Sequence, residues 1–217
     1  MKLHQELVKK IKDGKIGVIP TDTIYGVVTS AFSKKAIMRT YKILKRNPKK
    51  PLIVLIGSIR DLALFNIKID NATRNILEKL WPGKVSVVLS VPSKKFQYLH
   101  RGTKTLAFRV PKKPSLIRLL KYAGPLISTS ANPQGFKPAT TITEAKKYFG
   151  DGVDPVRKTG VTRKNKLLKK LYKSRLSNGV DFYIDGGKIK SLPSTLVEIK
   201  NGRVNVIRKG AVKIQKN

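Results

Sequence analysis

Residues 15–26 read KIGVIPTDTIYG, and residues 125–132 read PLISTSAN. In each stretch a short apolar run, 15–19 or 125–128, leads into a polar segment that is rich in hydroxyl groups. This order predicts a strand followed by a loop, with the loop at the strand end where open α/β sheets bind their ligands. Hydroxyl groups and exposed backbone amides suit an anionic small molecule, such as a nucleotide or an amino acid.

The hydrophobic pattern of the rest of the chain predicts helices that alternate with strands. Helices are expected over the segment that ends at Gly14, from Ser33 to about Leu44, over 58–65 and 71–80, from Pro114 to Tyr122, and over 144–149 with Thr143 as its cap. Strands are expected at 15–19, 51–56, 84–91, 104–110, 125–128 and 181–185, and a hairpin at 194–208 that turns at Asn201-Gly202. The alternation predicts an α/β fold of one domain, residues 1–217, with a mixed sheet.

The charge balance is the most unusual feature of the composition. The chain has 47 Lys and Arg against 12 Asp and Glu, a formal net charge of +35. Such a charge attracts polyanions and speeds their arrival, which makes an anionic partner the favoured interpretation. A lysine-rich bias with a solvated surface is the alternative that composition alone leaves open.

Cysteine is absent and only His4 and His100 are present, far apart in the sequence. Disulfides, thiolate catalysis and thiolate metal sites are therefore excluded. A serine–histidine–aspartate triad is disfavoured, because only two histidines are present. No apolar run has the form of a signal peptide or the length of a membrane span. We expect a cytoplasmic protein that does not contact a membrane.

One segment interrupts the alternation of helices and strands. Residues 157–178, RKTGVTRKNKLLKKLYKSRLSN, carry nine Lys and Arg and no acidic residue, and we interpret them as an insertion. The segment fits either a solvated surface loop or an arm that contacts the phosphates of tRNA or double-stranded RNA.

Eight stretches, in order along the chain, resemble the YrdC-like family of L-threonylcarbamoyladenylate synthases. They are PTDTIYG (20–26), KRNPKKPLIVLI (45–56), WPGKVSVVL (81–89), TLAFRVP (105–111), PLISTSANPQG (125–135), DGG (185–187), STLVE (194–198) and VIRKGAV (206–212). Together they cover almost the whole chain apart from the basic insertion. The chain is similar to the short members, without the additional C-terminal domain of the long ones.

The resemblance implies a twisted open mixed sheet and a nucleotidyltransferase reaction. Threonine, bicarbonate and ATP, with Mg²⁺, would give threonylcarbamoyl-AMP and pyrophosphate, and a downstream tRNA threonylcarbamoyl transferase complex would use the product. No covalent nucleophile from the protein is required, because the threonine carbamate itself attacks the α-phosphorus. A non-catalytic RNA-binding relative is the alternative function, and the related domain of hydrogenase maturation proteins is disfavoured by the short, cysteine-free chain.

The resemblance also implies roles at individual positions. ATP contacts are implied for Arg46, Lys50, Thr105, Ser130 and Arg208, and threonine contacts for Thr23, Arg109, Ser128 and Ser194. Leu44 departs from the family pattern, which has a lysine two positions before the arginine that Arg46 matches, and Lys45 is displaced from that place by one residue.

The residue types leave alternatives open at several of these positions. Asp22 fits a turn cap or a magnesium ligand, with the cap favoured. Arg109, in an otherwise apolar strand, needs an anion, which is either a substrate carboxylate held through its bidentate fork or the partner of a structural ion pair. Arg46 and Lys50 are also consistent with plain surface charge, and Asn132 is expected to fix its loop by bonds to the backbone.

Overall fold

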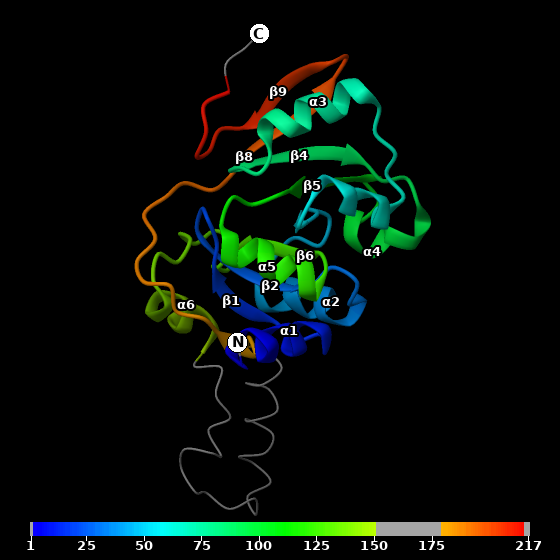
Figure 1. Ribbon diagram of the computed structural model, residues 1–217. Coiled ribbons are helices and arrows are strands. Elements are labelled where there is room, and N and C mark those ends of the chain that lie inside the picture. The colour runs from blue at the N-terminus through cyan, green and yellow to red at the C-terminus, as the bar shows by residue number, and fades with distance from the viewer. Residues whose placement is uncertain (1, 151–178, 215–217) are drawn as a thin grey trace, which may run out of the picture.

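The computed structural model describes residues 2–150 and 179–214. One mixed sheet of nine strands runs through these residues, in the spatial order β7-β1-β2-β6-β3-β5-β4-β8-β9, as Figure 1 shows. The predicted mixed α/β sheet is confirmed. The basic insertion predicted at 157–178 lies outside the described residues.

The strands come from the whole length of the described chain. Their bounds are β1 Gly17–Pro20, β2 Tyr25–Ser30, β3 Ile53–Leu55, β4 Val85–Ser90, β5 Thr105–Arg109, β6 Leu126–Ser130, β7 Phe182–Tyr183, β8 Thr195–Lys200 and β9 Arg203–Arg208. Only three neighbouring pairs are parallel, namely β1 with β7, β3 with β5, and β4 with β8. The C-terminal hairpin turns at Asn201 and Gly202, as predicted, and both residues have positive φ.

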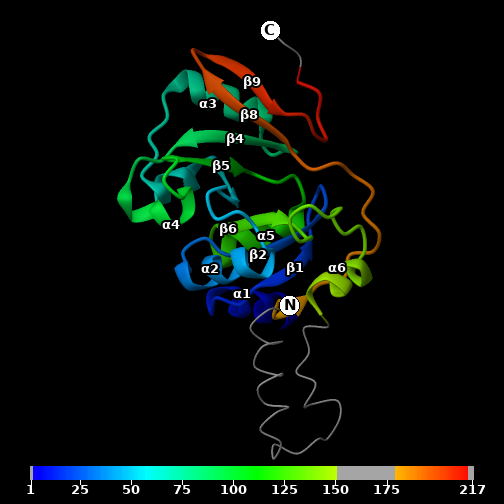
Figure 2. The ribbon, with the colours of Figure 1, turned by 180° about the vertical axis from the view of Figure 1, so that it is seen from behind.

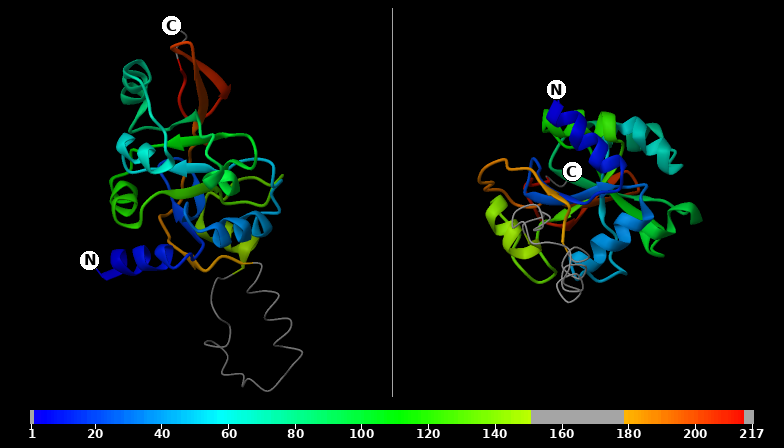
Figure 3. Two further views of the ribbon diagram at one scale, coloured as in Figure 1. Left: turned by 90° about the vertical axis from the view of Figure 1, so that its right-hand side faces the viewer. Right: turned by 90° about the horizontal axis from the view of Figure 1, so that it is seen from below.

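Helices cover both faces of the sheet. Their bounds are α1 Lys2–Lys12, α2 Lys34–Ile43, η1 Ile59–Phe65, α3 Asn71–Leu80, η2 Lys94–Phe96, α4 Gln97–His100, α5 Pro114–Ala123 and α6 Ile142–Phe149. Around the β1–β2 part of the sheet, α1 and α5 lie on one side and α2 and α6 on the other (Figure 3, right). The apolar stripes predicted for α2 and α5 are buried, including Ile37 and Tyr41 of the former and Leu116 and Leu120 of the latter.

Aromatic packing holds the centre of the largest hydrophobic cluster. The fully buried ring of Phe65, at the end of η1, has its centroid 5.0 Å from Phe108 of β5, 5.2 Å from Phe96 and 5.4 Å from Phe32. Offset and edge-to-face pairs of this kind add to the free energy gained from burial alone. Phe65 therefore couples η1 and η2 to the centre of the sheet.

The predicted strands and caps needed several corrections. Strand β2 was missed, because Tyr25–Ser30 is buried on both faces except at its last residue and so lacks the alternation that identifies a strand. The segment predicted as a helix at 58–65 is a 3-10 helix over Ile59–Phe65, and β3 is limited to Ile53–Leu55. Helix α6 begins two residues earlier than expected, because Thr141 rather than Thr143 accepts the capping hydrogen bond.

Across residues 2–150 and 179–214, no helix is both long enough and apolar enough to cross a membrane.

Replacing Phe65 tests the aromatic centre of the core. Phe65→Ala removes three ring contacts from a fully buried position, so we expect the free energy of unfolding to fall by about 3–5 kcal/mol in urea denaturation. The neighbouring Leu64 is 50% exposed, so Leu64→Ala is the control and should change stability by less than about 0.5 kcal/mol. Equal losses in the two variants would contradict this description of the core.

Candidate functional site

The predicted site residues in β6 and β5 lie on one face of the sheet. Ser128 in β6 pairs with Ile53 in β3, and Ile53 pairs with Ala107 in β5. Residues directly opposite each other on neighbouring strands share a face, as do residues two apart on one strand. The face of Ser128 therefore also carries Ser130, Thr105 and Arg109.

The same face continues across β4 to the C-terminal hairpin. Ala107 pairs with Val88 in β4, and the register of β4 with β8 sets Ser86 opposite Leu196, which in turn pairs with Arg208 in β9. Ser194 precedes β8, and its hydroxyl lies 2.9 Å from that of Ser86. All predicted site residues that lie on or next to strands β5, β6, β8 and β9 thus point to one side of the sheet.

Helices cover only part of this face among the described residues. Side chains of α1 and α5 pack on the β1, β2, β6 and β3 part through the cluster that contains Val28, Leu55 and Leu126. Beyond Arg109 the face is more exposed, since Thr105, Ala107 and Val88 are only half-buried. The predicted residues therefore lie where a helix-covered surface gives way to an accessible one.

The turn between β1 and β2 is built by Thr21. Its hydroxyl donates to the carbonyl of Ile24 at 2.6 Å and accepts from the backbone N–H groups of Thr23 and Ile24, at 3.1 and 3.2 Å. The Thr23 side chain is buried, and its hydroxyl lies 3.1 Å from that of Thr21. Thr21 thus caps this turn, a role that the sequence did not lead us to predict.

Arg109 forms a buried ion pair with Asp22. Arg109 Nη1 lies 2.9 Å from Asp22 Oδ1, and the two side chains are 4% and 7% exposed. Burial lowers the pKa of Arg109, and the charge and hydrogen bond of Asp22 oppose that shift. The other carboxylate oxygen of Asp22 accepts from the backbone N–H of Lys112 at 3.0 Å. The ion pair considered as an alternative for Arg109 is present, and Asp22 joins two segments instead of capping its own turn.

Buried polar side-chain atoms that have no hydrogen-bond partner gather in the predicted motifs. Within the described residues these atoms are His4 Nε2, Arg46 Nε, Arg109 Nε and Asn132 Oδ1. Buried polar groups in folded proteins are almost always bonded, so each exception requires an explanation such as a missing ligand or water. Three of the four belong to the stretches that were singled out from the sequence.

The loop at Asn132 has the arrangement that the sequence predicted. Asn132 Nδ2 donates to the carbonyls of Pro133 and Phe136, at 2.9 and 2.8 Å. These two bonds fix the orientation of the amide, so its Oδ1 remains an acceptor. The same loop reaches the segment that carries Arg46, because Gln134 Oε1 accepts from the N–H of Asn47 at 2.8 Å.

Arg46 and Arg208 lie within electrostatic range of each other. Burial is the largest effect that lowers the pKa of Arg46; Tyr41 raises it, and the positive charge of Arg208 lowers it further. Arg46 Nη2 donates to the carbonyl of Pro51 at 3.4 Å, and Arg208 Nη2 donates to that of Ser194 at 2.8 Å. Two guanidinium groups within electrostatic range of each other favour a nearby anion.

The Asp-Gly-Gly stretch at 185–187 forms hydrogen bonds with the hydroxyl of Tyr25. The Tyr25 hydroxyl donates to the carbonyl of Gly187 at 2.8 Å and accepts from the N–H of Gly186 at 2.9 Å. A Cβ atom at Gly186 would come within 2.6 Å of Pro20, so only glycine fits. From this point the chain runs along the side of the molecule from β7 to β8, as Figures 1 and 2 both show.

The remaining predicted residues have less distinctive surroundings. Ser128 is buried and Ser130 half-buried, and both lie in β6, which extends two residues beyond the predicted strand and so includes Ser130. The hydroxyl of Thr105 bonds to that of Thr103 at 3.3 Å. Lys50 is exposed; its backbone carbonyl accepts from the hydroxyl of Tyr41 at 2.9 Å, and its backbone N–H donates to the carbonyl of Asn47 at 3.1 Å.

Ser86 is the site residue that sequence reasoning missed. It is fully buried against Ser194 on the shared face. The pattern VSVVLS in β4 contained a usable signal, since a serine between valines points to the opposite face from its neighbours.

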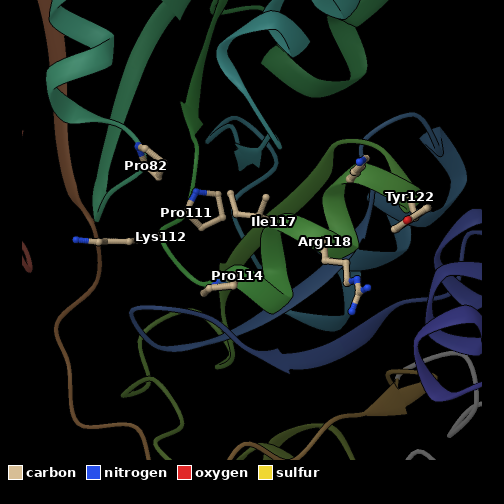
Figure 4. A pocket seen from close by; sticks show the side chains of 8 residues that line it. Pro82, Pro111, Lys112, Pro114, Ile117, Arg118 and Tyr122 are labelled. Atoms are coloured by element: carbon tan, nitrogen blue, oxygen red, sulfur yellow. The ribbon is translucent and has the colours of Figure 1, made fainter. Parts of the chain in front are cut away.

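A cavity of about 640 Å³ lies beside α5 and is separate from these residues (Figure 4). It is lined by Pro82, Pro111, Lys112, Pro114, Ile117, Arg118, Lys121 and Tyr122. None of the nine residues predicted to bind threonine or ATP lines it. Within residues 2–150 and 179–214, no group of three or more His, Cys, Asp or Glu is placed to hold a metal ion.

Comparison with known sequences gives a consistent set of relatives. The family model Sua5_yciO_yrdC, described as "Telomere recombination", matches residues 9–168. A Methanocaldococcus jannaschii protein named "Putative threonylcarbamoyl-AMP synthase" is 30% identical over 216 residues, which is 99% of this chain and 89% of that protein. A Hahella chejuensis threonylcarbamoyl-AMP synthase is 26% identical over 167 residues, which is 75% of this chain and 91% of the relative.

Among solved structures, the chain is similar to the P. abyssi Sua5 complexed with L-threonine. The TM-score is 0.76 at 22% identity, and the match covers 95% of this chain and 54% of the Sua5 chain. The chain thus spans about half the length of that protein. At this level of identity the likeness shows the fold.

Proposed function

Because the chain belongs to the Sua5/YciO/YrdC family, we propose that it is a threonylcarbamoyl-AMP synthase, the activity named for its relatives. The family membership confirms the resemblance that eight sequence stretches predicted. L-Threonine, bicarbonate and ATP are the proposed substrates. A threonine complex of the structurally similar P. abyssi Sua5 supports the first of them.

The proposed reaction has two steps. The threonine amine combines with bicarbonate to give a carbamate and water. A carbamate oxygen then attacks the α-phosphorus of ATP, forming one P–O bond while the bond to pyrophosphate breaks. Since the carbamate is the nucleophile, the protein has to hold several anions close together and neutralise developing charge.

The observation that carries this proposal is the set of unpartnered buried atoms. Arg46 Nε and Arg109 Nε are donors that lose their hydrogen bonds to water without gaining a partner from the described residues. A buried guanidinium with an unbonded N–H group raises the free energy of the folded protein, unless an anion accepts the missing hydrogen bond. We assign the threonine carboxylate to Arg109 and phosphate oxygens to Arg46.

The other predicted residues fit this division of the site. Thr23 and Ser128 are buried residues with hydroxyl groups. We assign them to the threonine substrate, together with Arg109 and with Ser194, whose hydroxyl contacts that of Ser86. Arg208 would meet the triphosphate opposite Arg46, and Thr105, Ser130 and Lys50 would complete the nucleotide contacts. Thr105 and Arg109 are four residues apart on β5, a separation of roughly 13 Å along a strand, which suits a nucleotide at one end and an amino acid at the other.

Mg²⁺ is proposed to enter with ATP. Asp22, the acidic residue of the turn, already bonds to Arg109 and to the N–H of Lys112, so we assign no protein carboxylate to the ion. Phosphate oxygens and water are its usual ligands in nucleotide sites. The product would pass to a tRNA threonylcarbamoyl transferase complex, and the net charge of +35 favours a contact with tRNA.

Pyrophosphate release tests the proposed activity. The full chain is incubated with ATP, Mg²⁺ and bicarbonate, with or without L-threonine, and pyrophosphate is measured. We expect release only when threonine and bicarbonate are both present, because the nucleophile is made from the two. A folded protein that releases no threonine-dependent pyrophosphate, yet binds RNA, would replace the synthase by the non-catalytic RNA-binding function.

A matched pair of variants tests the division of the site. Arg109→Lys and Arg46→Lys each keep a positive charge but remove the unpartnered Nε donor and the guanidinium fork. We expect Arg109→Lys to raise the KM for threonine about 10-fold and Arg46→Lys to raise the KM for ATP about 10-fold, each leaving the other KM within about twofold, as loss of a hydrogen bond to a charged group would produce. Equal changes in both constants for both variants would contradict the assignment.

A further inference from the structure

The turn that carries Thr23 is fastened to the end of strand β5. Asp22 contributes both carboxylate oxygens, one to Arg109 Nη1 at 2.9 Å and one to the backbone N–H of Lys112 at 3.0 Å. Lys113 Nζ adds a contact to the carbonyl of Pro20 at 3.4 Å. The turn at 20–24 and the segment after β5 are therefore held as one unit, mainly through Asp22.

The ion pair uses only one nitrogen of the guanidinium. Asp22 accepts a hydrogen bond from Nη1 of Arg109, whereas Nε is buried and has no partner among the described residues. The planar fork of arginine presents two parallel donors to a carboxylate when one edge is left open. Asp22 thus fixes the plane of the group and leaves another edge available.

We propose that Asp22 is a positioning residue, which holds the Arg109 guanidinium and the Thr23 turn in the arrangement that receives the carboxylate of the amino-acid substrate. This inference rests on the proposed synthase function and adds to it a residue that need not touch the substrate. Its side chain is 7% exposed, and each of its two carboxylate oxygens already accepts a hydrogen bond, which disfavours a role as a metal ligand or general base.

The opposite role for Asp22 would be to compete with the substrate. A carboxylate on Arg109 could occupy the place of the incoming one, and neutralising it would then tighten threonine binding. The geometry favours positioning, because the pair uses one nitrogen and Asp22 is also held by Lys112. The two roles predict opposite changes in affinity, so a single substitution distinguishes them.

Asp181 offers a matched control. Its Oδ2 atom accepts from Arg39 Nη1 at 2.7 Å and from the backbone N–H of Ile16 at 2.7 Å. Like Asp22, it therefore joins one arginine and one backbone amide from distant parts of the chain. It lies beside β7, away from the proposed site, so Asp181→Asn changes a comparable network without reaching Arg109.

The experiment compares Asp22→Asn, Asp22→Glu and Asp181→Asn with the wild-type chain. L-Threonine is titrated calorimetrically into each full-length protein, and KM values for threonine and ATP are measured in the pyrophosphate assay. For Asp22→Asn we expect threonine affinity to fall about 10-fold and its KM to rise equally, with the KM for ATP within about twofold, because a misplaced guanidinium loses a charged hydrogen bond. Asp22→Glu keeps the charge and should recover part of the affinity, and Asp181→Asn should leave both constants unchanged.

Two results would overturn the inference. Tighter threonine binding by Asp22→Asn would make Asp22 a competitor of the substrate. Threonine affinity equal to wild type, with only a lowered Tm, would make it a structural residue. If instead the wild-type chain needs no threonine for pyrophosphate release and does not bind it, the proposed function fails, which is a different outcome from either of these.

Discussion

The ion pair between Arg109 and Asp22 is the interaction on which the proposed site depends. Both side chains are almost completely buried, so neither could stay charged at reasonable cost without the other. Removing one partner of such a pair typically costs about 3–5 kcal/mol, because the remaining charge is left unpaired in the interior. The pair also sets where the β1–β2 turn lies relative to β5. A stabilising contact and the geometry of the site are therefore the same feature.

Around this pair, the sheet gathers residues from distant parts of the chain. Ser86 and Ser194 are 108 residues apart in sequence, and Tyr25 and Asp185 are 160 apart, yet each pair is in hydrogen-bond contact. The strand register sets Ser86 on the same face as Ser128 and Ser130, and α1 and α5 cover only one part of that face. Tyr25 lies on the opposite face, beneath α2 and α6. Arg208 lies on the face of Ser86, and its positive charge lowers the pKa of Arg46. An anionic substrate would offset the two positive charges, which connects the charge of the site to its proposed chemistry.

Sequence reasoning found the longer helices and the hairpin because amphipathic periodicity and the Asn201-Gly202 turn are local signals, but it did not predict η2 and α4. It missed β2, since a strand buried on both faces has no alternation, and it ended the predicted strand at Ser128, which placed Ser130 in a loop because hydroxyl residues suggest one. The pairing of Asp22 with Arg109 could not be read from the chain, as 87 residues separate them. Local patterns identify elements, whereas partners across the sheet depend on register and topology.

The most direct test of the central claim is a crystal structure of the full chain with L-threonine and a non-hydrolysable ATP analogue. The account predicts the threonine carboxylate on the open edge of Arg109, with the Asp22 contact retained, and the triphosphate between Arg46 and Arg208. Ligands bound instead in the 640 Å³ cavity beside α5, with Arg46 and Arg109 still unpartnered, would contradict it.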